Sequence, residues 1–404
     1  MPACRVQQLR WLDPDLGSIA LPGGEMAIRA GFGSGLAVRP GDPPGRVWAI
    51  CDRGPNLKAQ TLSDRYGLEL PTAVPKGAKI MPRLDLGPTL AELAIDGDEI
   101  NLLRTIRLTD ADGGSISGLP LRGSEHVRAE PAFDLAGQPL VPDPNGTDSE
   151  GLVALRDGGF WIGDEYGPSL IRVDSNGRLI RRWLPTGLQA RGEPKLPAIA
   201  GRRQINRGFE ALAISPDEQW LFLAFQSPLA HPDEAAHEQG RHVRIWRLDA
   251  TGGEVTAQYL YPLDAPDSFR RDCLKGKFER ADIKVSEILW MGESRLLVLE
   301  RGSETTKLYC VVLDEACAIP PAHLDVETCP TVEELSGGDR LSLPVLEKQL
   351  IFSSDDAPQV AADLEGMAWL SPSQLLLVSD NDFGVEGART SFWRLSFDQA
   401  FDIA

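Results

Sequence analysis

The stretch Asp148-Ser-Glu-Gly-Leu-Val-Ala-Leu-Arg-Asp-Gly-Gly-Phe-Trp-Ile-Gly-Asp-Glu-Tyr-Gly-Pro168, which continues to residue 184, decides the fold class. It holds short apolar runs at 152–155, 160–163, 169–173 and 179–184, separated by turn sequences rich in Gly, Asn and Asp. This pattern predicts four short strands in an antiparallel meander. Acids mark two places in the unit: Glu150 where the first strand starts, and Asp164 with Glu165 where the second ends. In an antiparallel hairpin these two places lie side by side.

Similar units recur along the chain, with further copies beginning near residues 33, 208, 285 and 364. The first copy predicts strands at 33–38, 46–55, 78–84 and 100–108. The last copy offers only three strands, at 364–370, 374–384 and 391–397, before the chain runs out. The N-terminal run 4–11 is strand-like and otherwise unassigned, so we expect it to supply the missing strand. Stacked four-stranded units whose last member is completed by the opposite terminus are typical of a ring.

The sequence therefore predicts an all-β protein, a β-propeller of four-stranded antiparallel blades closed by the N-terminal strand. Five repeats are detected, and six blades result if 110–147 conceals a degenerate unit. We expect residues 1–404 to form a single propeller domain. Within it, 1–12 is the closing strand, 111–147 a long loop excursion and 315–340 a second long loop.

Composition limits the function. The 404 residues carry a net charge of −18, with 40 Gly and 31 Pro. Such an acidic chain argues against nucleic acid or an anionic membrane as partner, and against a polyanionic substrate unless a bound cation reverses the local charge. No run approaches 18 apolar residues, and the N-terminus has no signal-peptide pattern, so we expect a cytoplasmic protein that does not enter the membrane and acts as a monomer.

Acids recur at equivalent positions of the repeats. If first-strand starts and second-strand ends open on one face of the ring, about ten acidic side chains converge on one mouth of its central channel. Close like charges are costly unless a cation neutralises them, and hard cations such as Ca²⁺ take six to eight oxygen ligands in flexible geometry. The alternative is that these acids only cap turns. The predicted metal ligands are Asp52, Glu150, Asp164, Glu165, Glu210, Glu287, Glu300, Glu365, Asp380 and Asp382.

Basic residues are interleaved at the same edge. Arg53 follows Asp52, Arg301 follows Glu300, and Arg207 precedes the third copy, while Lys307 lies near a third-strand start. Arginine suits a bidentate grip on phosphate or carboxylate, so we predict that Arg53, Arg207, Arg301 and Lys307 bind an anionic substrate. Salt bridges within the acid ring are the alternative reading. As catalytic residues we predict Glu150, Glu210 and Asp164, one of which acts as a base.

Several motifs occur in an order that resembles the phytase-like propeller family, described as having esterase-like activity of phytase. The resemblance covers roughly residues 30–400. It implies a β-propeller whose relatives include calcium-dependent phosphate-ester hydrolases, many of them exported. The motifs are Asp52-Arg-Gly-Pro-Asn56, Asp148-Ser-Glu-Gly-Leu152, Gly163-Asp-Glu-Tyr-Gly-Pro-Ser-Leu170, Asn206-Arg-Gly-Phe-Glu210, Gln226-Ser-Pro-Leu229, Leu364-Glu-Gly366 and Asp380-Asn-Asp-Phe-Gly384.

The sequence leaves three functions open. The first is a calcium-dependent hydrolase of a phosphoester or related anionic ester, in which metal ions polarise the ester and lower the pKa of bound water. The second is a non-catalytic, calcium-stabilised propeller that binds a ligand. The third is a lactonase-type propeller hydrolase. The fold alone does not separate them.

Overall fold

The protein is built almost entirely of antiparallel sheets. The computed structural model describes residues 2–123, 127–337 and 341–403. Within them, five sheets have the four-stranded meander, one of them extended by a fifth, parallel strand, β15 (Glu193–Leu196). Their strands are β4 (Gly35–Ala37), β5 (Arg46–Ile50), β8 (Thr89–Asp96) and β9 (Glu99–Arg107); β11 (Ser149–Ala154), β12 (Phe160–Asp164), β13 (Ser169–Val173) and β14 (Leu179–Pro185); β16 (Phe209–Ile214), β17 (Trp220–Phe225), β18 (His242–Asp249) and β19 (Val255–Pro262); β20 (Lys284–Trp290), β21 (Arg295–Arg301), β22 (Thr306–Val312) and β23 (Lys348–Ser353); and β24 (Leu364–Ser371), β25 (Gln374–Ser379), β26 (Ser391–Phe397) and β1 (Cys4–Leu9).

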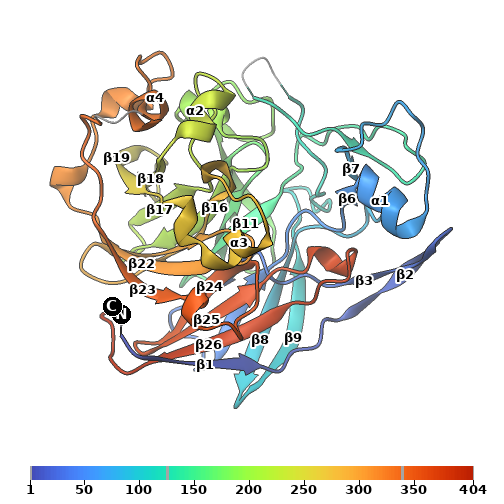
Figure 1. Cartoon of the computed structure of the whole chain (residues 1–404), viewed down its shortest axis with the longest axis horizontal. Coiled ribbons are helices and arrows are strands. Elements are labelled where there is room, and N and C mark those ends of the chain that lie inside the picture. The colour runs from blue at the N-terminus through green and yellow to red at the C-terminus, as the bar shows by residue number, and fades with distance from the viewer. Residues whose placement is uncertain (1, 124–126, 338–340, 404) are drawn as a thin grey trace.

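The first strands of the five sheets contact one another in succession, β4 with β11, β11 with β16, β16 with β20, β20 with β24, and β24 with β4. This is a propeller-like arrangement (Figure 1). The approach is close: a Cβ added to Gly35 would lie 2.4 Å from the carbonyl oxygen of Glu150, and one added to Gly151 would lie 2.6 Å from that of Glu210. Glycine at these two positions is therefore what allows neighbouring strands to meet at the axis.

The predicted pairing of the two termini is present. β1 pairs antiparallel with β26, from Cys4 opposite Phe397 to Leu9 opposite Phe392. The N and C termini consequently lie side by side (Figure 1). The strand contributed by the beginning of the chain completes the fifth sheet.

Most predicted strands are confirmed, but the third strand of the first sheet was misplaced. It was expected at 78–84 and is instead β8, which forms a hairpin with β9 through Gly97 at φ +62°. Residues Lys79–Ile80 form β7, in a separate small sheet with β6 (Leu57–Lys58) and β10 (Ala132–Phe133). Apolar and polar residues do not alternate regularly along Thr89–Asp96. The reason is that Leu90, Ala91 and Leu93 are all fully buried, so both faces of this strand carry apolar side chains.

The remaining elements lie outside the five sheets. A hairpin of β2 (Asp15–Leu21) and β3 (Gly24–Arg29), which the sequence analysis did not predict, extends away from the ring (Figure 1). The described parts of the predicted loops 111–147 and 315–340 contain only β10 and short helices; residues 124–126 and 338–340 lie outside the described residues. The helical segments are α1 (Ala59–Tyr66), α2 (Glu234–Gln239), α3 (Arg270–Lys275), α4 (Val332–Gly337), η1 (Ala198–Arg202), η2 (Pro266–Ser268), η3 (Arg280–Asp282), η4 (Glu315–Cys317), η5 (Pro321–Leu324), η6 (Ser354–Asp356) and η7 (Asp382–Gly384).

Apolar side chains fill the space between neighbouring sheets. Trp183 and Trp246 are fully buried in one cluster that joins the sheets of β11, β16 and β20. Trp48 packs edge-on against Phe160 between the first two sheets, with ring centroids 4.9 Å apart. These contacts fix the sheets relative to one another and so hold the first-strand starts in place. Among the described residues, no helix combines the length and apolar character needed to cross a bilayer.

Candidate functional site

β-Bulges at the starts of the first strands aim acidic side chains toward the axis. In β16 and β24 the bulge leaves Glu210 and Glu365 without a cross-strand partner, and in β11 it contains Glu150. A bulge interrupts the regular alternation of side chains and re-aims the extra residue. Three of the four predicted first-strand acids therefore occupy equivalent positions.

Glu287 does not belong to this set, which corrects the sequence prediction. The bulge in β20 falls on Ser286, so Glu287 lies one residue further into the strand. Its carboxylate is fully buried and accepts the backbone N–H groups of Leu212 at 3.4 Å and Ile288 at 3.0 Å. Burial raises the pKa of Glu287 well above its ordinary value. Glu287 thus lies inside the channel and not at its mouth.

Asp164 and Glu300 also lie outside the mouth, because side chains alternate along a strand. Each is directly opposite a first-strand residue, Ser149 and Val285 respectively. The following residue, Glu165 or Arg301, is the one directed toward the axis.

The contacts of these two acids confirm that they serve the packing between strands and sheets. Asp164 accepts hydrogen bonds from Arg182 at 2.7 Å and Ser169 at 2.6 Å. Glu300 accepts from Lys348 at 2.6 Å and Tyr261 at 2.5 Å. We therefore remove Asp164 from the candidate bases and both acids from the candidate metal ligands.

Lys307 belongs to the same buried network as Glu300. Its Nζ donates to Asp264 at 2.6 Å and to Ser268 at 2.7 Å, and Asp264 in turn pairs with Lys348 at 2.8 Å. This lysine is satisfied between two sheets and was wrongly assigned to substrate binding.

Two groups of acids do converge at the mouth. Asp148, Glu150 and Glu165 are all buried, and each offers an oxygen within 4.8 Å of the others. Asp52, Asp380 and Asp382 form a second group with the same spacing. Glu210 lies close to the first group, since its charge raises the pKa values of Glu150 and Glu165.

Burial is the first cause of the raised pKa values in these groups, and neighbouring carboxylates add to it. Burial and the charge of Asp148 raise the pKa of Asp52 to about 7. Burial, partly opposed by Arg301, raises that of Glu365 to about 8. The pKa of Asp380 is likewise raised well above its ordinary value by burial and by Asp52. Buried carboxyl groups with strongly raised pKa values are typical of a functional site.

Two of the predicted substrate-binding arginines are buried partners of these acids. Arg53 is 4% exposed and pairs with Asp148 and Glu130, each at 2.9 Å, beneath the ring of Tyr166. Arg301 is 1% exposed and pairs with Glu365 and with Asp363. Both guanidinium groups are occupied, so neither is available to grip a substrate.

Arg207 and Lys284 are two cations near the mouth acids that remain available. Both are half-buried, and neither forms an ion pair with any residue of the described chain. Arg207 lies near Glu165 and Glu210, and Lys284 near Glu365 and Glu210. Burial lowers the pKa of Arg207, and the charge of Arg301 lowers that of Lys284. The sequence analysis predicted Arg207 but missed Lys284, whose only signal was its place at the start of β20.

The mouth has the chemistry of a site for a hard cation. The donors are carboxylate, amide and hydroxyl oxygens, which suit Ca²⁺. Among the described residues, the buried atoms Gln226 Oε1, Asp380 Oδ1 and Ser34 Oγ have no hydrogen-bond partner. Buried oxygens without a hydrogen-bond partner are rare in proteins, so these three atoms indicate that an ion or another ligand binds beside them. The residues present therefore fit a calcium ion, and Asp148 joins the acids that the sequence analysis had named as ligands.

The raised pKa values predict how the metal-free protein responds to pH. A group whose folded pKa exceeds its unfolded value stabilises the fold below the unfolded pKa, and that stability is lost as pH rises through the folded pKa. For Asp52 and Glu365 the unfolded pKa is about 4. With chelator present, we expect the free energy of unfolding, measured by urea titration, to decline between about pH 5 and pH 9. The double variant Asp52→Asn, Glu365→Gln should flatten this slope; an unchanged slope in that variant would contradict the assignment.

The sequence of the chain is similar to a known protein family and to a fungal protein. The phytase-like family, described as "Esterase-like activity of phytase", matches residues 28–383. An "Uncharacterized secreted protein" of Arthroderma benhamiae is 28% identical over 320 residues, which is 68% of this chain and 59% of the relative. The match thus spans less than two thirds of that relative's length.

Solved structures give weaker likenesses. They include a luciferin-regenerating enzyme (TM-score 0.39, 11% identity, 96% of this chain and 95% of that one) and a PQQ-bound aldose sugar dehydrogenase from Streptomyces coelicolor (0.34, 12%, 98% and 99%). A gluconolactonase from Xanthomonas campestris has a TM-score of 0.31 at 12% identity, covering 98% of this chain and 99% of that one. At scores below 0.5 these likenesses carry no argument about function.

Proposed function

This chain belongs to the phytase-like family described as having esterase-like activity of phytase, and from that membership and the mouth geometry we propose that it is a calcium-dependent hydrolase of an anionic ester, in particular a phosphoester. The observation that carries the proposal is that two acid groups lie near Arg207 and Lys284, two cations that form no ion pair within the described part of the chain. Acids and cations in one site suit a negatively charged substrate held beside a metal ion.

The metal would be held by the two acid groups. Asp148, Glu150 and Glu165 form one set of ligands, and Asp52, Asp380 and Asp382 the other. When bound, calcium polarises the ester and lowers the pKa of attacking water. Five of these six acids are buried or partly buried, and Asp382 is exposed, so the inner acids lie in a low-dielectric region where the attraction of a cation is strong.

The chain's own residues bind the substrate and move the proton. Arg207 and Lys284 hold the anionic group by charge-assisted hydrogen bonds. Glu210 is the proposed base: one of its oxygens, Oε2, accepts a hydrogen bond from Gln226 Nε2, which orients the carboxylate. Its other oxygen takes a proton from the attacking water as the water oxygen bonds to the ester's central atom; the bond from that atom to the leaving oxygen breaks, and the leaving alcohol takes up a proton from solvent.

We also propose that the whole chain is one propeller domain of five blades and acts as a monomer. The succession of first-strand contacts around the axis and the pairing of β1 with β26 support this. In a closed ring no sheet edge is left open between blades.

A hydrolase screen tests the proposed function. Phosphomonoesters, phosphodiesters, carboxylic esters and lactones are assayed with calcium and after chelation. We expect turnover of a phosphoester that chelation abolishes. Calcium should also stabilise the fold by mass action, by about 2.7 kcal/mol at a concentration 100 times its Kd.

Three outcomes would contradict the proposal. Calcium binding without turnover of any ester would favour the ligand-binding alternative. An absence of binding in isothermal titration, for calcium and for other divalent cations, would leave the acids as structural groups only. Turnover of lactones alone would favour the lactonase-type alternative.

A further inference from the structure

A cavity of about 260 Å³, here called the Arg107 cavity, lies beside the first sheet. Residues of β8 and β9 line it, together with Pro14 and Leu16 at the start of the β2–β3 hairpin. The rings of Phe32 and Phe383 also line it, and both side chains are buried. The volume lies just below the usual range of drug-sized ligand sites, so the cavity suits a small occupant.

The polar groups on the buried side of this cavity are satisfied within the protein. The thiol of Cys51 is 2% exposed and donates to the backbone carbonyl of Gly87 at 3.5 Å. The hydroxyl of Thr89 donates to the same carbonyl at 2.8 Å. Burial raises the pKa of the Cys51 thiol well above its ordinary value, so the thiol carries no charge. These residues therefore leave an apolar interior for an occupant.

Arg107 is the one charged residue in the lining. Its Nη1 donates to the backbone carbonyl of Asp85. Its Nη2 lies at the wall of the cavity, 3.7 Å from the place that a Cβ on Gly87 would take. Within the described residues, Nη2 has no hydrogen-bond acceptor and Arg107 forms no ion pair. This guanidinium nitrogen is therefore free to bind an anion in the cavity.

The nearby carboxylate of Asp85 pairs with a different cation. Arg83 binds both of its oxygens, each at 2.6 Å, and these hydrogen bonds lower the pKa of Asp85. Arg83 also donates from Nη1 to the carbonyl of Leu16 at 3.3 Å, which ties the start of the hairpin to the rim of the cavity. Arg83, Asp85 and Arg107 together carry one net positive charge. A rim with excess positive charge favours an anionic occupant.

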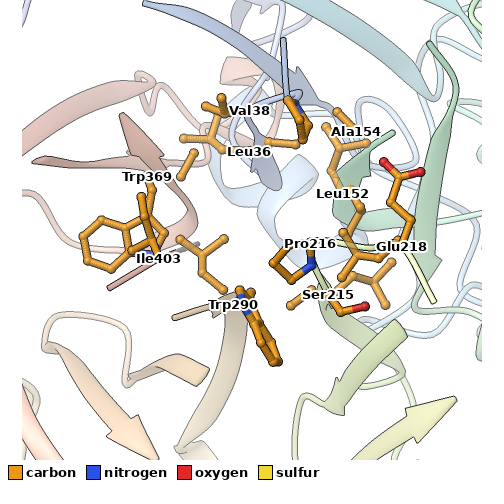
Figure 2. A pocket seen from close by; sticks show the side chains of 18 of the residues that line it. Leu36, Val38, Leu152, Ala154, Ser215, Pro216, Glu218, Trp290, Trp369 and Ile403 are labelled. Carbon is orange, nitrogen blue, oxygen red and sulfur yellow. The ribbon is translucent and has the colours of Figure 1, made fainter. Parts of the chain in front are cut away.

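A larger cavity of about 320 Å³, lined by the ends of the first strands (Figure 2), has no such excess of charge. Its lining holds one cation, Arg156, and one acid, Glu218. That lining does not select one class of occupant. This control cavity is useful in the test below, because apolar binding alone would not distinguish it from the Arg107 cavity.

We propose that the Arg107 cavity binds a monocarboxylate with a short hydrocarbon chain. The carboxylate accepts a charge-assisted hydrogen bond from Nη2 of Arg107. The hydrocarbon chain is removed from water against the side chains of Leu16, Phe32 and Phe383. The site does not rest on the proposed hydrolase chemistry.

The test is isothermal titration with octanoate at about pH 7, in chelator so that the carboxylate cannot bind calcium. We expect saturable binding of one octanoate per chain. The affinity should rise about fourfold for each methylene group from butanoate to octanoate, because each buried methylene adds a similar increment. An affinity that does not depend on chain length would mean that the carboxylate binds a surface arginine only, and would overturn the proposal.

Arg107→Met removes the charge and keeps an unbranched side chain. It should weaken octanoate binding by about tenfold or more, and leave the binding of uncharged 1-octanol unchanged. Arg104→Met is the matched control on the same strand. Arg104 pairs with Glu92 at 2.5 Å and packs over the ring of Trp48 on the other face of the sheet. Octanoate should bind this variant as it binds the wild type.

Two bulky substitutions test the place of binding independently of the charge. Thr105→Trp adds bulk at an exposed position of the lining and should weaken octanoate binding by about tenfold. Val38→Trp adds the same indole at the control cavity, where Val38 is 40% exposed, and should have no effect.

Three further outcomes would overturn the proposal: no saturable binding of octanoate, equal binding in Arg107→Met and the wild type, or loss of binding in Val38→Trp. The proposed calcium ligands and Glu210 do not line the Arg107 cavity, so failure here leaves the proposed function untouched.

Discussion

Glu210→Gln should lower kcat by about 10²–10⁴-fold, the range that general-base catalysis contributes. The amide has the shape of the carboxylate but does not take a proton from water. The bond to Gln226 can be kept by rotating the amide so that its oxygen accepts, and the fold should therefore persist. The measurement is steady-state kinetics on the ester found in the screen, at saturating calcium, with the melting temperature as a check on folding.

Glu287→Gln is the matched control for this variant. The same chemical change is made one position beyond the bulge of a neighbouring first strand, where the side chain accepts backbone N–H groups inside the channel. An amide oxygen can accept the same bonds, so kcat should stay near the wild-type value. If Glu210→Gln retained full turnover, or if both variants lost it equally, Glu210 would not be the base.

The strands could be predicted from the sequence wherever clear turn sequences separate them. Gly, Asn and Asp turns between 148 and 184 set the strands of the second sheet, and the incomplete last copy pointed to the N-terminal strand that pairs with β26. The third strand of the first sheet could not be predicted in this way. There the strand Thr89–Asp96 is buried on both faces and lacks the alternation by which half-buried strands are recognised.

Two groups of acids gather at the strand ends that the sequence indicated, but several of the predicted side chains differ in register. A bulge adds one residue, and a shift of one residue turns a side chain to the other face. That is why Ser286 occupies the position expected for Glu287. Glu165 reaches the mouth and Asp164 does not because successive side chains of a strand point to opposite faces. Nothing in the sequence distinguishes a bulged strand start from a regular one.

The roles of the cations depended on contacts between distant loops. Arg53 is next to Asp52 in the sequence, but its partners are Asp148 and Glu130, and Tyr166 packs on it. Arg207, by contrast, is left without an ion pair among the described residues. Adjacent charges in the sequence therefore indicated where acids and arginines gather, while the division into cations with and without an ion pair required the fold.

Arg53→Ala should destabilise the protein by about 3–5 kcal/mol, because removing one partner of a buried ion pair leaves the other charge uncompensated. Arg53 pairs with Asp148 at 2.9 Å, and the exposed fractions of the two side chains are 5% and 0%. The loss should appear as a lower urea midpoint in chelator.

The matched control is Arg10→Ala. Arg10 pairs with Asp98 at a similar distance, 3.0 Å, but the side chains are 71% and 53% exposed, so the loss should be at most about 1 kcal/mol. Calcium should recover part of the stability lost in Arg53→Ala, since a cation beside Asp148 would replace the missing charge, and it should not change the effect of Arg10→Ala. If Arg53→Ala instead left stability intact and only raised KM for an anionic substrate, the guanidinium would be a substrate contact after all, and the division of the mouth cations proposed here would have to be reversed.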